Sequence, residues 1–191
     1  MNGCVISGSD GGGKSNVLGF IAQTLGKDEK TKLYIYEDKV FLEKLCPNAK
    51  TAHDAKAADE IISELASEFD NRDDDSEGRV VFCIDDFANF YKGISNESAS
   101  FMNNITQGGA DRGMYFYIVC DVKGLAKMHT YKVKPFMNCL ANENAIAVGG
   151  ALGEYQAFRN LHSDENIVFA APYEGCMIHK GKVVQMKIAK I

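Results

Sequence analysis

The sequence has no apolar stretch long enough to cross a bilayer, and its N-terminus has no basic segment followed by an apolar one. A membrane-spanning helix needs roughly 20 apolar residues, and an export signal needs those two segments in that order. We therefore expect a chain that does not itself insert into a membrane and is not exported.

Metal-binding spacings are also missing. The six cysteines form no C-x-x-C pair, and the four histidines are isolated from one another. Several cysteines lie inside apolar runs, where cysteine usually behaves as a small hydrophobic residue. This pattern suits a reducing cytosol and gives no indication of structural zinc.

The chain lacks an excess of positive charge as well. Its formal net charge is −5, and no stripe of Lys and Arg alternates with aromatic residues. Nucleic-acid binding draws most of its free energy from clustered basic side chains. The composition therefore disfavours DNA as a partner.

Apolar runs alternate with segments of helical period, which is typical of a parallel sheet flanked by helices. We expect an α/β fold with a mainly parallel, five-stranded core sheet, its strands near residues 4–7, 33–37, 80–85, 115–120 and 145–148. A length of 191 residues suffices for one such core and is too short for two. We therefore expect residues 1–191 to be a single domain, excised from a longer protein.

Two helices are clear in the sequence. The first covers residues 54–69, where apolar side chains recur every three or four positions, and Thr51 and Asp54 resemble a capping box at its start. The second begins near Asn96 and stops at Gly108 and Gly109.

The C-terminal stretch has a different pattern. Two mostly apolar stretches, residues 176–178 and 183–188, flank Lys180 and Gly181, which predict a tight turn. We expect an antiparallel β-hairpin at the edge of the sheet.

A glycine-rich loop lies between the first strand and the first helix. It matches the Walker A pattern G-x-x-x-x-G-K-[ST] in full. Bare backbone N–H groups and the N-terminus of the following helix stabilise phosphate oxygens, a Lys reaches the β- and γ-phosphates, and a Ser hydroxyl binds Mg²⁺. The sequence thus predicts MgATP binding, with a flexible glycine turn as the alternative. The expected nucleotide-binding residues are Gly8, Ser9, Asp10, Gly11, Gly12, Gly13, Lys14, Ser15 and Asn16.

A second part of the site follows the apolar run at residues 80–84, where Asp85 and Asp86 give a Walker B pattern. Carboxylates at the carboxyl end of a parallel strand lie where α/β sheets bind ligands. We assign Asp85, with Ser15, to magnesium. Asp86 would orient or deprotonate an attacking water, or would cap the next turn.

Asp121 ends the strand at residues 115–120 and is a third catalytic candidate, with loop capping as its alternative. An arginine acting from a neighbouring domain is not singled out by any local pattern. The candidates are Arg72, Arg79, Arg112 and Arg159.

Together these segments resemble one family. The phosphate loop followed by VVFCIDDF, GGADRGMYFYIVCDVKG and ENAIAVGGALGEYQAF is similar to the FtsK/SpoIIIE class of RecA-like (ASCE) P-loop NTPases. Within that class the chain looks most like the last ATPase domain of the type VII secretion membrane ATPases of the EssC/EccC type. The similarity covers nearly the whole chain, and its specific part is residues 108–156.

The resemblance implies a cytoplasmic ATP-binding domain of a bacterial cell-membrane protein that contributes to substrate export. Its partners would be neighbouring ATPase domains of the same chain and secreted substrates of the WXG100 type. The class typically has GIHLVLATQRP where this chain has GMYFYIVCDVK, so that Asp121 replaces Gln and Val122 replaces Arg. Because Asp86 also stands where such ATPases more often carry Glu, we expect weak or regulatory hydrolysis. A DNA-translocase domain and a nucleotide-stabilised docking module without turnover are the alternatives.

Overall fold

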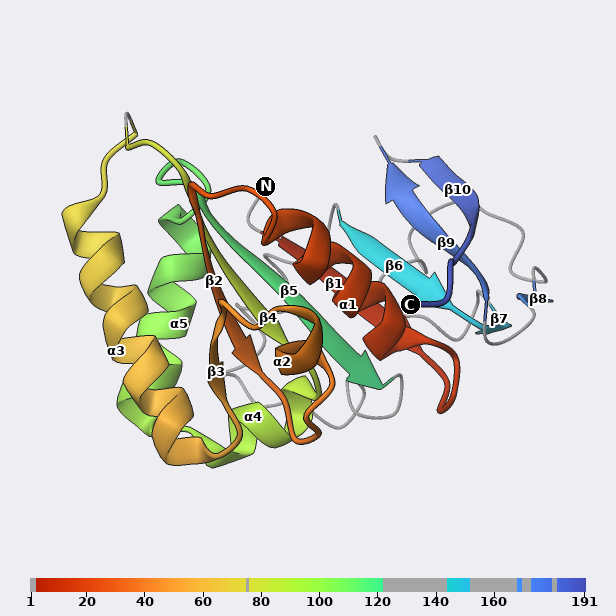
Figure 1. Ribbon diagram of the computed structural model, residues 1–191, viewed down its shortest axis with the longest axis horizontal. Helices are drawn as coiled ribbons and strands as arrows, with labels where there is room; N and C mark the ends of the chain where they lie inside the picture. The colour runs from red at the N-terminus through yellow and green to blue at the C-terminus, as the bar shows by residue number, and fades with distance from the viewer. Residues whose placement is uncertain (1–2, 75, 122–143, 152–167, 170–172, 180–181) are drawn as a thin grey trace.

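The computed structural model describes residues 3–74, 76–121, 144–151, 168–169, 173–179 and 182–191. Its main feature is an eight-stranded sheet in the order β10-β9-β6-β1-β5-β4-β2-β3 (Figure 1). From β6 to β3 the strands are parallel, whereas β9 and β10 are antiparallel. The strands are β1 (Gly3–Gly8), β2 (Thr31–Tyr36), β3 (Lys50–Ala52), β4 (Arg79–Ile84), β5 (Met114–Asp121), β6 (Ala145–Val148), β9 (Glu174–His179) and β10 (Lys182–Lys187). A small second sheet pairs β7 (Gly150–Ala151) with β8 (Val168–Phe169).

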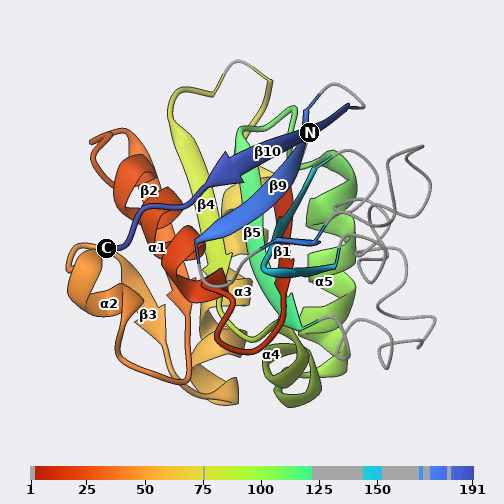
Figure 2. The same ribbon diagram turned by 90° about the vertical axis from the view of Figure 1, so that its right-hand side faces the viewer.

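Helices cover both faces of the sheet (Figure 2). One apolar cluster joins α3, α4 and α5 to one face, and a second joins α1 and α2 to the other. The helices are α1 (Lys14–Leu25), α2 (Leu42–Leu45), α3 (Ala55–Asn71), α4 (Phe87–Gly93) and α5 (Asn96–Gly108). None of the helices in the described ranges has the length and apolar character required to cross a membrane.

Burial explains why these residues form these elements. In β4 every residue after Arg79 is buried, as expected for a central parallel strand covered on both faces. In α3 the apolar stripe faces the sheet, and the Asp54 side chain caps the helix by accepting from the backbone N–H of Ala57 at 2.9 Å. Phe82 of β4 meets Phe90 of α4 edge to face, with 5.6 Å between ring centroids.

The predicted α/β architecture is confirmed. All five expected strands are present, both expected helices lie within two residues of their predicted bounds, and β9 and β10 pair as an antiparallel hairpin at the sheet edge. The turn at Lys180 and Gly181 lies outside the described residues. The expectation for Thr51 was wrong, because Thr51 lies in β3 and Asp54 alone caps α3.

The order of the strands determines where a ligand can bind. β1 lies between β5 and β6, so the chain leaves β1 towards one side of the sheet and returns later on the other side. At such a point the loops after adjacent parallel strands diverge and leave a crevice at their carboxyl ends. The loop at residues 8–15 starts at this position.

Candidate functional site

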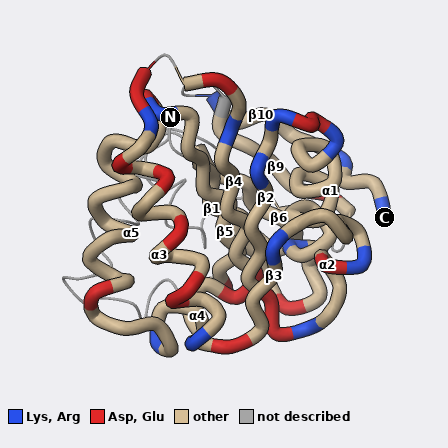
Figure 3. The backbone as a smooth tube through the Cα atoms, turned by 60° about the vertical axis from the view of Figure 1, so that its left-hand side comes forward, with Lys and Arg blue, Asp and Glu red and all other residues tan. Residues whose placement is uncertain are grey.

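A cleft of about 510 Å³ lies at the carboxyl ends of β1, β4 and β5. Several of the residues predicted from the sequence line it together: Asp10, Gly11, Lys14, Ser15, Asp85, Asp86 and Asp121. Asp38 and Lys39, from the loop after β2, also line the cleft. With them, five aspartates and two lysines contribute to its walls. Figure 3 shows acidic positions gathered beside α4 at this end of the sheet.

Strand alternation places the carboxylates. Cys83 of β4 and Val119 of β5 pack on the α1 side of the sheet, as does Val81. Side chains two residues apart along a strand point to the same face. Asp85, two residues after Cys83, and Asp121, two residues after Val119, therefore fall on the α1 side as well. The register between β1 and β5 sets Gly8 opposite Asp121. The loop and both acids therefore converge on the same edge.

Glycines shape the loop and leave its peptide at Gly11 exposed. Gly11 and Gly13 have φ angles of 72° and 96°, a region that strongly favours glycine. A Cβ added at Gly11 would meet no heavy atom within 4 Å, so open space lies beside this peptide. Gly13 is the N-cap of α1 and has no side chain to occupy the first N–H groups of the helix. These donors therefore remain suited to an anion.

Lys14 is held over the loop by the loop itself. Its ammonium donates to the carbonyl oxygens of Gly8 at 3.0 Å and Ser9 at 2.9 Å, and its side chain is only 13% exposed. The Asp10 carboxylate lies 3.9 Å away but is fully exposed, so water screens this pair. The carbonyl oxygens of Gly8 and Ser9 thus hold the Lys14 ammonium at the cleft before any ligand binds.

Ser15 and Asp85 form the most direct contact between the two predicted halves of the site. The Ser15 hydroxyl donates to Oδ1 of Asp85 at 3.1 Å. Burial raises the pKa of Asp85 above its ordinary value, and Glu37 and Asp86 raise it further, against the lowering effects of Ser15 and Lys14. A cation beside Asp85 would relieve this unfavourable burial of charge.

Asp85→Asn is expected to stabilise the free protein at pH 7. A raised pKa in the folded state means that ionisation costs stability as the pH rises above the ordinary carboxyl pKa of about 3.9. The amide removes this cost, so the Tm of Asp85→Asn at pH 7 should lie above that of wild type. Thermal unfolding at pH 7 and below pH 4 measures the difference, which should vanish at the lower pH. Asp10→Asn is the control, and a lower Tm for Asp85→Asn would contradict the expectation.

Asp86 adopts a strained conformation at the start of α4. It has φ 64° and is the one non-glycine residue with positive φ among the described residues. Its Oδ1 accepts from the backbone N–H of Asn89 at 3.1 Å, and its Oδ2 accepts from the Asn89 amide at 2.7 Å. The capping alternative for Asp86 is therefore observed, in a residue that also lines the cleft. Strain of this kind costs about 1–3 kcal/mol and clusters at functional sites.

Asn16 lies outside the cleft lining. Its amide donates to the Ala189 carbonyl and accepts from the backbone N–H of Ile191 at 2.9 Å. The helix that follows the loop is thereby tied to the segment after β10. The other predicted loop residues, Gly8, Ser9, Gly12 and Gly13, are not among those that line the cleft, and Gly13 is the N-cap of α1.

Three of the four arginine candidates, Arg72, Arg79 and Arg112, lie at the other end of the sheet. Arg72 donates to the carbonyl oxygens of Arg112 at 2.7 Å and Gly78 at 2.8 Å. Arg112 donates to the Phe69 carbonyl and stacks on the Phe69 ring, 4.2 Å from its centroid. These contacts surround the amino ends of β4 and β5, away from the loop. Arg159 and Val122 lie outside the described residues.

Besides Asp38 and Lys39, two further polar residues of this region were not predicted from the sequence. Glu37 is fully buried, and its carboxylate accepts from the backbone N–H groups of Phe41, Leu42 and Glu43 at 2.7–3.0 Å. Asn89 contacts Asp86 and lines the cleft. The signal for Glu37 was available, because it ends a predicted strand just as Asp85 does. Asn89 gave no comparable signal.

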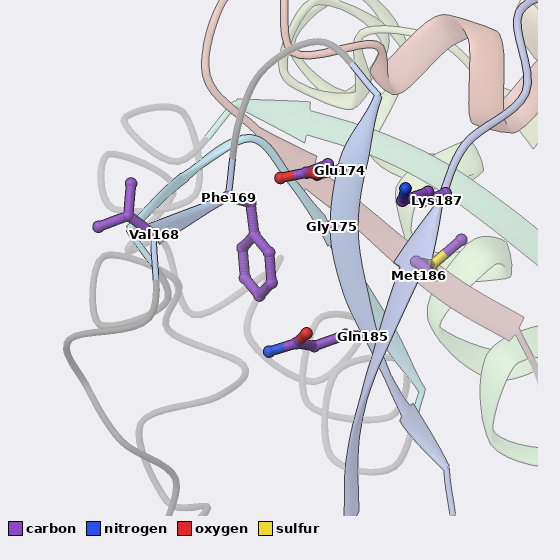
Figure 4. A pocket seen from close by; sticks show the side chains of 7 residues that line it. All are labelled: Val168, Phe169, Glu174, Gly175, Gln185, Met186 and Lys187. Carbon is purple, nitrogen blue, oxygen red and sulfur yellow. The ribbon is translucent and has the colours of Figure 1, made fainter.

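A second cleft, of about 300 Å³, lies beside the β9–β10 hairpin (Figure 4). The ring of Phe169 faces the hairpin there, and Glu174 and Lys187 are paired positions of β9 and β10. None of the predicted nucleotide-binding residues lines this cleft. It is therefore separate from the phosphate loop.

The strand order and the glycine loop after β1 define a class of fold: the α/β fold of P-loop NTPases. No protein-family model matches the chain, and no curated protein matches it either. Solved structures do match. Thermomonospora curvata EccC (ATPases 2 and 3), in complex with a signal sequence peptide, aligns with a TM-score of 0.77 and 14% identity over 100% of this chain and 37% of its own. EssC (ATPases 2 and 3) from Geobacillus thermodenitrificans aligns with a TM-score of 0.74 and 18% identity over 98% of this chain and 37% of its own.

A third match is the genome packaging NTPase B204 from Sulfolobus turreted icosahedral virus 2 in complex with AMPPCP, with a TM-score of 0.61 and 10% identity over 98% of this chain and 97% of that one. The chain spans 24% to 38% of the EccC and EssC chains that it matches. At these identities the comparisons establish the fold. They confirm the predicted resemblance to EssC/EccC ATPase domains at that level.

Proposed function

We propose that this chain binds MgATP in the cleft at the phosphate loop. The observation that carries the proposal is the contact of Ser15 with Asp85 at 3.1 Å, beside a Lys14 ammonium held over a glycine loop. Gly8 to Ser15, with Asn16 behind them, would hold the phosphates through backbone N–H groups and Lys14. Support also comes from the B204 match, whose structure contains AMPPCP.

Magnesium fits the donor set of the cleft. Ser15 and Asp85 offer two oxygen ligands, and Mg²⁺ usually takes one or two protein ligands with water and phosphate oxygens completing its shell. Within the described residues no group of three or more His, Cys, Asp or Glu is placed to hold a metal by itself. Five aspartates and only two lysines line the cleft, and a bound Mg²⁺ would supply positive charge to offset this excess of negative charge. We therefore expect nucleotide affinity to depend strongly on magnesium.

The larger role proposed is that of one ATPase domain in a type VII secretion motor. The fold matches EccC and EssC, whose matched chains are longer than this one and carry several ATPase domains. We propose that residues 1–191 form one such domain in the cytoplasmic part of a membrane protein. Neighbouring ATPase domains would be its partners. The signal sequence peptide bound to EccC suggests export signals, including those of WXG100 substrates, as the polypeptides concerned.

Titration of the purified chain with a fluorescent ATP analogue tests the binding proposal. We expect saturable binding below the millimolar range that is lost on adding EDTA. The absence of saturable binding in excess Mg²⁺ would contradict it. A thermal shift with ATP but no phosphate release would instead indicate a docking module stabilised by its nucleotide, since 100 Kd of ligand adds about 2.7 kcal/mol.

A DNA-translocating ATPase is the second candidate. It is favoured by the B204 match, which covers 97% of a genome packaging NTPase. The net charge of −5 weighs against it, because duplex binding needs clustered basic side chains. Salt-dependent retention on duplex DNA together with DNA-stimulated phosphate release would reverse our preference.

Asp86→Glu is expected to raise the steady-state rate of phosphate release by about tenfold, and Asp86→Ala to lower it. Asp86 is one methylene shorter than Glu, and an error of about 1 Å in the position of a catalytic group can cost ~100-fold in rate. Colorimetric phosphate release at saturating MgATP measures both variants beside wild type. Equal rates in all three would show that Asp86 does not touch the reaction.

A further inference from the structure

Asn89 holds the catalytic candidate Asp86 at two points. Asn89 is the third residue of α4, and its backbone N–H and its side-chain amide each donate to a different oxygen of the Asp86 carboxylate, at 3.1 and 2.7 Å. Both bonds have the Asp86 carboxylate as acceptor, and hydrogen bonds to an ionised acceptor are stronger than those between neutral groups. Two donors on one carboxylate fix the plane of the group as well as its position. The carboxylate is thus oriented by α4.

The same amide reaches a second carboxylate. Nδ2 of Asn89 lies 3.3 Å from Oδ2 of Asp38, and Oδ1 of Asp38 accepts from the Tyr36 hydroxyl at 3.4 Å. An amide nitrogen has two N–H groups, one for each acid. Asn89 therefore links the loop after β2 to the loop after β4 across the cleft, and Asp38 remains as an acceptor if the bond to Asp86 breaks.

We propose that Asn89 is a positioning residue that restrains Asp86 and slows ATP hydrolysis, an inference that rests on the proposed MgATP site. To orient a water against a γ-phosphate, the Asp86 carboxylate has to turn towards the bound nucleotide. Asp86 can turn away from α4 only by giving up both bonds to Asn89, the 3.1 Å bond from its backbone N–H and the 2.7 Å bond from its side-chain amide. The amide keeps Asp38 as an acceptor during that turn, so the restraint is reversible.

Of the two bonds from Asn89 to Asp86, only the one from the side-chain amide depends on the residue type at position 89. The bond from the Asn89 backbone to Asp86 is a helix cap and persists with any side chain at position 89. The amide bond disappears on substitution. Removing it leaves α4 capped and both carboxylates exposed to water in the cleft. Asn89 itself is exposed, so its replacement creates no buried unpaired group.

The test compares Asn89→Ala with wild type in steady-state phosphate release and in binding of a fluorescent ATP analogue. Because the Asn89 side chain is exposed and water can take its place, we expect the loss of its bond to Asp86 to raise kcat only about three- to tenfold, with KM changed less than about twofold. Asn89→Ser, whose hydroxyl can still donate, should stay near the wild-type rate. Lys92→Ala, on the last turn of α4, is the control for an exposed substitution in this helix.

The gain must pass through Asp86. The double variant Asn89→Ala with Asp86→Ala should show no gain over Asp86→Ala alone. An unchanged or lower kcat in Asn89→Ala with analogue binding intact overturns the inference, and so does the absence of phosphate release in every variant of a chain that binds the analogue. If wild type itself fails to bind the analogue, the proposed function fails first.

Discussion

Lys14→Ala is expected to weaken binding of MgATP about 100-fold. The Lys14 side chain is only 13% exposed, and the carbonyl oxygens of Gly8 and Ser9 already accept hydrogen bonds from its ammonium, so little has to reorganise when phosphate replaces these acceptors. A hydrogen bond to a charged partner contributes about 1.5–3 kcal/mol, and 2.8 kcal/mol corresponds to two decades in Kd. Isothermal calorimetry with a slowly hydrolysed ATP analogue measures the loss.

Lys39→Ala is the matched control for this prediction. Lys39 lines the same cleft and carries the same charge, but it is exposed and belongs to the loop after β2. Its loss should weaken binding only a few-fold, because water and salt screen exposed charges. Equal effects of the two substitutions would mean that net charge, and not the phosphate loop, holds the nucleotide.

Much of the fold could be predicted because burial and sequence pattern coincide there. β4 and β5 are apolar runs in the centre of the sheet, and α3 has one apolar stripe. Short elements were missed for a physical reason. β3 has three residues and α2 has four, so neither is long enough for its apolar pattern to repeat recognisably. Both are stabilised by tertiary contacts, including the anchoring of α2 by Glu37.

The residues of the candidate site likewise divide into those that the sequence could predict and those that it could not. The contact between Ser15 and Asp85 could be expected, since a phosphate loop and the acid after an apolar parallel strand meet at one edge of a sheet. The capping geometry of Asp86 was one of two alternatives, and the choice depended on the turn into α4. Asn89 could not be selected, because its role comes from a side-chain distance to Asp38 across 51 positions of sequence.

Glu37→Ala is expected to lower the free energy of unfolding by about 3 kcal/mol. Glu37 is fully buried, and its carboxylate accepts three backbone N–H groups at the start of α2. Leaving one buried donor unpaired costs about 1–3 kcal/mol, and partial access of water limits the sum. At about 2–4 °C per kcal/mol, Tm should fall by about 6–12 °C. Thermal unfolding without nucleotide measures this loss.

Glu37→Gln separates charge from shape. The amide keeps one acceptor oxygen but turns a donor towards N–H groups, so its Tm should lie between those of Glu37→Ala and wild type. Glu43→Gln, on a half-exposed neighbour in α2, should stay within about 0.5 kcal/mol of wild type. If Glu37→Ala unfolds like wild type, the carboxylate does not stabilise the fold. If it unfolds early, the loop that carries Asp38 and Lys39 into the cleft depends on an anchor behind the site, and nucleotide affinity should fall with it.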